Sequence, residues 1–305
     1  MSGMHRDRLK PGARQKVRAV IRACAAVLFN GYMTGFAKGK IFTGKTKAFC
    51  VPVLNCYSCP GALGACPIGS LQAVLGSSGR FPFYVLGLLM LFGTVMGRLV
   101  CGLLCPFGLI QDLLHRIPGK KIKVPERADR ILRYLKYVIL IVFVILLPAF
   151  WRDDMGSYAP WFCKYICPAG TLEGGLPLVL MNPQFRKLAG GIFTWKVTVL
   201  VLVIIGSVLI PRFFCRYLCP LGAFYSLFNR FSMYRMEYDK SSCIGCGMCE
   251  KACPMAVKVT EDINCAECIR CGKCADVCPK HAICPSFRLA DKKTSGPVQE
   301  PKENI

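Results

Sequence analysis

The sequence predicts an α-helical membrane protein with about four transmembrane helices, followed by a small α+β domain rich in cysteine. Three observations lead to this expectation: four long apolar segments, a cysteine motif that occurs twice in the apolar region, and a longer cysteine motif that occurs twice near the C-terminus. The composition agrees, because 53% of the 305 residues are hydrophobic and the mean hydropathy is +0.41. The 21 cysteines have spacings typical of metal ligands.

The four apolar segments approach the roughly 20 residues that a helix needs to cross the hydrocarbon core of a bilayer. They cover residues 17–37, 81–101, 131–151 and 192–211. Basic residues gather before the first segment and between the second and the third, so these parts are expected to face the cytoplasm. With four spans the C-terminal domain is also cytoplasmic, in a multi-pass protein of the cytoplasmic membrane. If the first segment only lies on the membrane surface, the outward placement of residues 38–80 fails.

The first segment is expected to remain as an anchor, because no small-residue cleavage site follows the basic N-terminus. The formal net charge of +23 would also suit a protein that binds nucleic acid. The basic residues, however, flank apolar segments, where membrane topology explains them. The lipid bilayer is therefore the expected partner of this region, and no nucleic acid partner is expected.

A cysteine motif in the second apolar segment is repeated after the fourth. Residues 97–117, GRLVCGLLCPFGLIQDLLHRI, align with residues 211–231, PRFFCRYLCPLGAFYSLFNRF. Proline after the second cysteine favours the first turn of a new helix and leaves that cysteine near the positive end of the helix dipole. The matched pairs are Arg98 with Arg212, Cys101 with Cys215, Cys105 with Cys219 and Pro106 with Pro220.

This repeat predicts how the apolar region is arranged. The halves, about 17–117 and 131–231, begin with spans that run in the same direction, so we expect a parallel repeat with an approximate two-fold axis along the membrane normal. The axis would bring the two C-x3-C pairs together, and four thiolates are the ligands of an iron–sulfur cluster. The alternative is that these cysteines are small buried residues of membrane helices. The predicted ligands of this inner cluster are Cys101, Cys105, Cys215 and Cys219.

A second group of cysteines lies in the connections expected to face outward. The stretches CPIG and CPAG begin at Cys66 and Cys167, and Ala62 stands where the repeat would match Cys163. Disulfides are the alternative here, because the outer face is an oxidising compartment. The predicted ligands of an outer cluster are Cys59, Cys66, Cys163 and Cys167, with Cys56 as the reserve ligand.

Two copies of C-x2-C-x2-C-x3-C-P follow after residue 242. This is the pattern of bacterial two-cluster ferredoxins, in which the fourth cysteine of each copy binds the other cluster. Zinc is an alternative for paired C-x2-C motifs, but two complete copies ending in Cys-Pro argue against it. Cys265 adds one more C-x2-C step and would allow a shifted ligand set. The predicted ligands are Cys243, Cys246, Cys249 and Cys278 for the first [4Fe–4S] cluster, and Cys268, Cys271, Cys274 and Cys253 for the second.

The expected organisation has four parts. They are a basic cytoplasmic arm (1–16), a transmembrane cluster-binding domain (17–232), a 2[4Fe–4S] ferredoxin domain (233–287) and a tail (288–305) whose polar composition predicts disorder.

The C-x3-C-P motifs at the ends of apolar segments, followed by a two-cluster ferredoxin domain, resemble the NapH/NosR-type family of polyferredoxin membrane proteins. The resemblance covers most of residues 80–283. It implies electron transfer between the quinone pool or a membrane-side flavin and redox partners, in anaerobic respiration or in the maturation of respiratory enzymes. The additional motif at Cys163 and Cys167 departs from the two-motif pattern, so neither nitrate nor nitrous oxide reduction is assigned.

We therefore expect a membrane-bound iron–sulfur electron-transfer protein, the electron-transfer subunit of a membrane oxidoreductase, with no catalytic residues of its own. Its expected partners are a quinol or a flavin-binding protein at the outer face and a ferredoxin or dehydrogenase in the cytoplasm. One alternative is a quinol dehydrogenase subunit that binds a quinone beside His115, Asp112 and Gln111, although these residues also suit the polar face of an interfacial helix. The other is a maturation or redox-sensing factor for a metalloenzyme.

Overall fold

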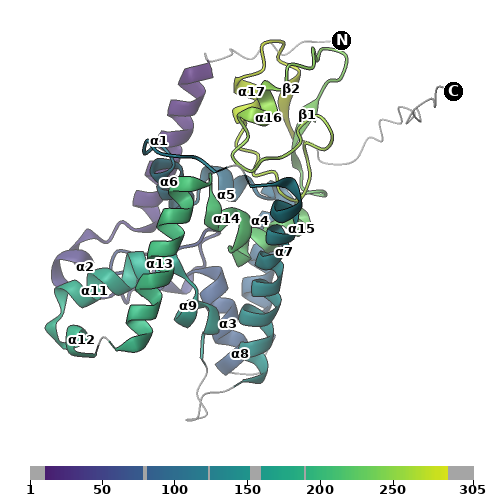
Figure 1. Ribbon diagram of the computed structural model, residues 1–305. Coiled ribbons are helices and arrows are strands. Elements are labelled where there is room, and N and C mark those ends of the chain that lie inside the picture. The colour runs from purple at the N-terminus through teal and green to yellow at the C-terminus, as the bar shows by residue number, and fades with distance from the viewer. Residues whose placement is uncertain (1–10, 78–80, 123, 152–158, 189, 288–305) are drawn as a thin grey trace.

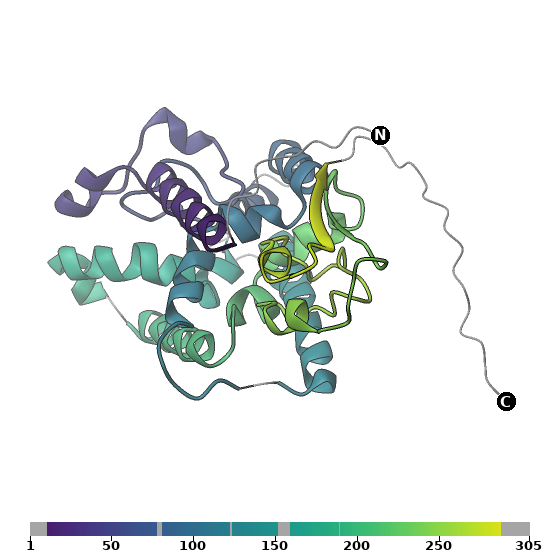
Figure 2. The ribbon, with the colours of Figure 1, turned by 90° about the horizontal axis from the view of Figure 1, so that it is seen from above.

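The computed structural model describes residues 11–77, 81–122, 124–151, 159–188 and 190–287 (Figure 1). These residues are mostly helical, and a small domain with a two-stranded sheet lies at one end of the helical part. Figure 2 shows that this domain covers only part of that end, with α1 passing beside it. The tail predicted to be disordered and residues 1–10 of the basic arm lie outside the described residues.

The helical part consists of two series of helices, each of which contains long helices and short ones next to cysteines. The first series is α1 (Pro11–Phe29), α2 (Met33–Lys38), η1 (Lys45–Ala48), α3 (Pro67–Ser77), α4 (Phe83–Met96), α5 (Leu99–Leu103) and α6 (Pro106–Leu114). The second is α7 (Glu126–Ile139), η2 (Leu140–Leu146), α8 (Leu147–Phe150), α9 (Trp161–Tyr165), α10 (Pro168–Gly170), η3 (Thr171–Gly175), α11 (Leu176–Met181), α12 (Pro183–Leu188), α13 (Gly191–Leu209), α14 (Phe213–Tyr217) and α15 (Pro220–Phe228).

Two helices among the described residues are long and apolar enough to cross a membrane. They are the continuous helix of α7, η2 and α8, and α13. The predicted span 81–101 is divided, because α4 has only 14 residues and ends at Gly97, whose φ of +56° turns the chain. Helix α1 has 19 residues but carries Arg18 and Arg22 within it. Two of the four predicted segments therefore form helices of spanning length.

Four of the five Cys-Pro pairs in the helical part begin a helix, the exception being Cys59-Pro60, and the two pairs of the repeated motif are among them, as predicted. Proline suits the first helical position because its φ already matches the helix and no bond partner is needed for a backbone N–H there. The cysteine before it is held at the helix start. The sulfurs of Cys167 and Cys219 each accept a hydrogen bond from the backbone N–H three residues later, at 3.3 and 3.4 Å. The four prolines are Pro67 in α3, Pro106 in α6, Pro168 in α10 and Pro220 in α15.

The small domain is built from two cysteine-bearing loops closed by a two-stranded antiparallel sheet. Strand β1 (Tyr234–Tyr238) pairs with β2 (Ile283–Phe287), so that the two ends of the domain meet. Between them lie two single-turn helices, α16 (Met248–Lys251) and α17 (Lys273–Asp276), one in each copy of the cysteine motif. Because loops form most of the domain, its fold depends on what the cysteines bind.

The buried core surrounds the cysteines of the helical part. Phe162 of α9 and Phe214 of α14 are fully buried, and each directly precedes a cysteine. Leu89 of α4 and Val144 of η2 are also fully buried and belong to the same core. The long helices therefore pack around the cysteine-bearing segments.

Candidate iron–sulfur sites

The inner site brings together the four cysteines of the repeated motif. In each motif the first cysteine lies in a short helix, α5 or α14, and the second directly precedes the next helix, α6 or α15. The four cysteines line a single cavity of about 310 Å³ together with Leu54 and Arg98. Each sulfur-bearing residue is less than 10% exposed, so water is largely excluded. The four are Cys101, Cys105, Cys215 and Cys219.

Two buried arginines connect the halves of the inner site in a reciprocal way. Arg98 donates from Nη2 to the carbonyl oxygen of Cys215 at 3.4 Å, and Arg212 donates from Nη1 to the carbonyl oxygen of Cys101 at 3.1 Å. Each arginine therefore reaches the first cysteine of the other motif. Both side chains are at most 1% exposed, so two guanidinium groups place positive charge beside a site whose thiolates would be negative.

Each of the two arginines also forms an ion pair with a carboxylate. Arg212 pairs with Asp112 of α6 at 2.8 and 2.9 Å, and Asp112 also pairs with Arg22 of α1. These contacts keep the pKa of Asp112 well below its usual range, although burial opposes ionisation. Asp112 is thus a structural counter-ion that fixes α1 and α14 to α6, which leaves no free carboxylate there for the suggested quinone contact.

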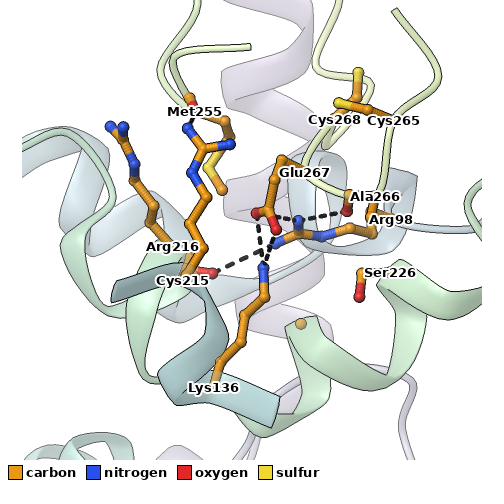
Figure 3. Close-up of polar contacts among 12 residues, drawn as sticks. Arg98, Lys136, Cys215, Arg216, Ser226, Met255, Cys265, Ala266, Glu267 and Cys268 are labelled. Atoms are coloured by element: carbon orange, nitrogen blue, oxygen red, sulfur yellow. Dashed lines mark hydrogen bonds and ion pairs between the residues drawn. The ribbon is translucent and has the colours of Figure 1, made fainter. Parts of the chain in front are cut away.

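Arg98 also joins the inner site to the small domain (Figure 3). Its Nη1 donates to the carbonyl oxygen of Ala266 at 2.8 Å and to Glu267 at 3.1 Å, and Lys136 of α7 donates to both oxygens of Glu267 at 2.6 and 2.7 Å. Glu267 thus lies between two cations whose side chains are fully buried. Next to it in sequence is Cys268, so this network fixes a ferredoxin loop against the inner site.

The loop of the second ferredoxin site packs directly on the inner site. A Cβ atom on Gly102 would overlap the carbonyl oxygen of Ile269 and lie 3.6 Å from the Cα of Cys271. Only glycine allows this approach, and it stands next to Cys101. The residue next to a ligand of the inner site is therefore in backbone contact with a ligand loop of the second ferredoxin site.

The outer site brings together three of the four predicted ligands and the reserve ligand. Cys56, Cys66, Cys163 and Cys167 line one cavity of about 1470 Å³. The sulfurs of Cys56 and Cys167 are near each other, because a Cβ on Gly170 would lie 3.6 Å from both.

Cys59, by contrast, does not line this cavity. It is 1% exposed, and its backbone N–H donates to the carbonyl oxygen of Cys56 at 3.1 Å. All 21 cysteines lie within the described residues and all are free, so the disulfides considered as an alternative for the outer face are not formed here.

Burial governs the chemistry of the outer cysteines. Burial, with a smaller contribution from nearby acidic groups, raises the pKa of the Cys56 and Cys163 thiols to about 12. Glu173 of η3 accepts a hydrogen bond from the backbone N–H of Cys56 at 3.0 Å, and burial raises its pKa to about 7. The cysteines should therefore be protonated until a cationic centre binds, and binding should release protons.

The two ferredoxin sites contain the predicted ligand sets, each completed by the fourth cysteine of the other motif. A cavity of about 390 Å³ is lined by the first set, and one of about 350 Å³ by the second. Cys265 does not line the second cavity, and its carbonyl oxygen instead accepts a hydrogen bond from Asn229 of the helical part. The first set is Cys243, Cys246, Cys249 and Cys278, and the second is Cys253, Cys268, Cys271 and Cys274.

These sites fit iron–sulfur clusters better than single metal ions. Among the described residues, no three side chains of the metal-binding types converge closely enough to hold one ion. Zinc would require every sulfur to lie about 2.3 Å from the same ion. A [4Fe–4S] cluster is larger and is bound at its corners by four cysteines, and each of the four cavities offers four.

A helical scaffold that buries cysteine quartets beside a two-cluster ferredoxin fold defines an iron–sulfur electron transport protein. Comparison with known proteins agrees. A family described as 4Fe-4S binding domain matches residues 81–125 and 193–234, which contain the inner site, and a second family of the same description matches residues 235–257. No solved structure matches the chain.

Relatives identify the family. The uncharacterized proteins MJ0749 and MJ0750 of Methanocaldococcus jannaschii are 32% and 33% identical to the chain, over 66% of its length and over 68% and 76% of theirs. YccM of Escherichia coli K12, provisionally described as an electron transport protein, is 31% identical over 66% of the chain and 56% of its own length. The chain belongs to the NapH/NosR-type family of ferredoxin-type electron transport proteins.

Proposed function

We propose that the protein carries electrons across a membrane, between a quinol or flavoprotein at the outer face and a redox protein in the cytoplasm, through [4Fe–4S] clusters at its four cysteine sites. The observation that carries this proposal is that neighbouring sites are in contact. Leu54 lines both the outer and the inner cavity. The second ferredoxin loop packs on Gly102 beside the inner site. In each ferredoxin motif three cysteines line one cavity and the fourth lines the other. Cys249 lines the first cavity, for example, and Cys253 lines the second.

The chain itself supplies position, burial and charge to this series of sites. A [4Fe–4S] cluster provides one-electron chemistry, whereas the protein determines where the cluster lies and its potential. The buried arginines beside the inner site favour the more negative state of whatever the four thiolates hold. The ion-pair network around Glu267 holds the ferredoxin loop in place while electrons pass.

The proposal includes a membrane-spanning helical part arranged as a parallel two-fold repeat. Apolar side chains of α13 point outward, and Val201, Leu202 and Ile205 are 46–60% exposed, which suits contact with lipid rather than water. The reciprocal contacts of Arg98 and Arg212 support the two-fold axis. The basic segments next to α1 and α7 favour a cytoplasmic position for the small domain.

For the outer cluster we propose Cys56 as the fourth ligand in place of Cys59. Cys56 lines the outer cavity with the other three cysteines, and Cys59 does not. Both residues lie in the same irregular stretch three positions apart, so they form a matched pair for substitution.

The test is anaerobic quantification of iron and acid-labile sulfide in detergent-purified protein, with EPR of the reduced state. About sixteen irons per chain are expected, because four [4Fe–4S] clusters contain that number. Cys56→Ser should reduce this to about twelve and Cys59→Ser should leave it unchanged. About eight irons in the unmodified chain, confined to the ferredoxin motifs, would overturn the transmembrane series.

A second candidate function, oxidation of a quinol at the outer site, is favoured by the size of the outer cavity. At about 1470 Å³ it is far larger than the inner cavity of about 310 Å³, although each presents four cysteines. Its other lining is mostly small and apolar, and Lys196 of α13 is the charged residue among those that line it. Quinol-driven reduction of the clusters should slow in Lys196→Met and not in the control Lys187→Met, which changes an exposed lysine of α12. Equal rates in both variants would exclude this site.

A further inference from the structure

Two buried glutamines make the same unusual set of contacts, one at each membrane site. Gln111 donates from Nε2 to the sulfur of Cys215 at 3.1 Å, and its Oε1 accepts from the backbone N–H of Phe214 at 3.0 Å. Gln72 donates from Nε2 to the sulfur of Cys163 at 3.4 Å, and its Oε1 accepts from the backbone N–H of Phe162 at 3.0 Å. Both glutamines are at most 1% exposed.

Their positions follow from the Cys-Pro motif. Each glutamine stands six residues after a ligand cysteine, Gln72 after Cys66 and Gln111 after Cys105, on the helix that the proline begins. From there the side chain crosses to the other half of the chain, where it meets the first cysteine of a C-x3-C-P motif. The common geometry arises from a common local fold.

The orientation of both amides is determined by their surroundings. The Nε2 of Gln72 also donates to the carbonyl oxygen of Ile68 at 3.2 Å, and that of Gln111 to the carbonyl oxygen of Phe107 at 3.4 Å. A reversed amide would place its oxygen against a carbonyl oxygen and its NH₂ against a backbone N–H. The N–H therefore has to face the sulfur.

We propose that Gln72 and Gln111 raise the reduction potentials of the outer and inner clusters by donating an N–H···S hydrogen bond to one cysteine ligand of each. This inference rests on the proposed function, because it assumes clusters at both sites. Reduction adds one electron to a cluster and increases the negative charge on its sulfurs. A donor aimed at such a sulfur therefore stabilises the reduced state more than the oxidised state, and the dry surroundings strengthen this effect.

The experiment is an EPR-monitored redox titration of the full chain with Gln111→Met or Gln72→Met. Gln111→Met should make reduction of the inner cluster about tenfold less favourable, which is a shift of about 59 mV to more negative potential for a one-electron couple. The outer cluster should not change. Gln72→Met should shift only the outer cluster, so each variant is the control for the other. The inner and outer signals are identified as those lost in Cys105→Ser and Cys66→Ser.

A second pair of variants separates tuning from folding. Gln111→Glu and Gln72→Glu, titrated at a pH high enough to ionise the new carboxyl, keep the acceptor for the backbone N–H, lose the donor to the sulfur and add a negative charge, so they should lower the potential of their own cluster by more than the Met variants do. Unchanged potentials at full iron content would overturn the tuning role and leave the proposed function intact. Loss of the cluster in both the Met and the Glu variants would also overturn it, in favour of ligand placement. Absence of both membrane clusters from the unmodified chain would instead refute the proposed function.

Discussion

Replacing Glu267 with glutamine should open the interface between the small domain and the helical part. Glutamine keeps the size and shape of the side chain, so the change removes the negative charge between Arg98 and Lys136, both of which are 0% exposed. Removal of one partner of a buried ion pair costs about 3–5 kcal/mol, because the remaining charge stays buried without compensation. At about 1.4 kcal/mol for each factor of ten, the interface should open at least roughly 100 times more often.

The opening is measured as amide hydrogen exchange across residues 265–271 in the full chain. Glu261→Gln is the matched control: its carboxylate pairs with Lys258 at 3.5 Å, but the side chains are 70% and 54% exposed, so this pair contributes less than about 1 kcal/mol. Lys136→Met added to Glu267→Gln should restore part of the protection, because one uncompensated cation is then removed. Equal exchange in the Glu267 and Glu261 variants would show that charge does not hold this interface.

Three other predictions concern the inner site and its surroundings. Cys101→Ser and Cys219→Ser should each abolish the same EPR signal, since their sulfurs line one cavity; signals lost separately would contradict a shared cluster. Asp112→Asn should destabilise the helical part by about 3–5 kcal/mol, because Arg212 and Arg22 both lose their counter-charge, and thermal unfolding in detergent would detect it. The interface at Glu267 should weaken in acid. Burial opposes ionisation of this carboxyl, but its cationic neighbours hold its pKa below the ordinary 4.5, so the stabilisation is complete above pH 4.5 and is lost as the pH falls below it. Hydrogen exchange corrected for intrinsic rates should rise at the interface below that pH, and a pH-independent protection would count against the pairing.

The parts of the cysteine sites that are close in sequence could be predicted. Short spacings define which loop holds the ferredoxin ligands, and the structure brings those sets together. The inner site was predicted from the repeat, because the two matching motifs were expected to lie opposite each other, and their four cysteines line one cavity. The break in the second apolar segment could not be predicted from hydropathy, since Gly97 is compatible with a continuous helix until its positive φ is known.

The remaining features depend on contacts between distant residues. Cys56 and Cys59 lie at similar distances in sequence from Cys66, so spacing alone does not distinguish them, and the structure shows that Cys56 lines the outer cavity. The partners of Glu267 lie 131 and 169 residues away in the sequence, and no pattern connects them. The one available signal for the two glutamines was their shared spacing, because Gln72 and Gln111 each follow the cysteine of a Cys-Pro pair by six residues.

The contact at Gly102 limits the distance between the inner site and the second ferredoxin site. Between the outer and the inner cavity lies the side chain of Leu54, which a mutation can enlarge or shorten. At Gly102 two backbones are in contact, so their separation cannot become smaller, and any larger residue would push the ferredoxin loop outward. In the proposed series of clusters, the distance between the helical part and the small domain is therefore already at its minimum, and a larger residue at Gly102 should slow electron transfer there.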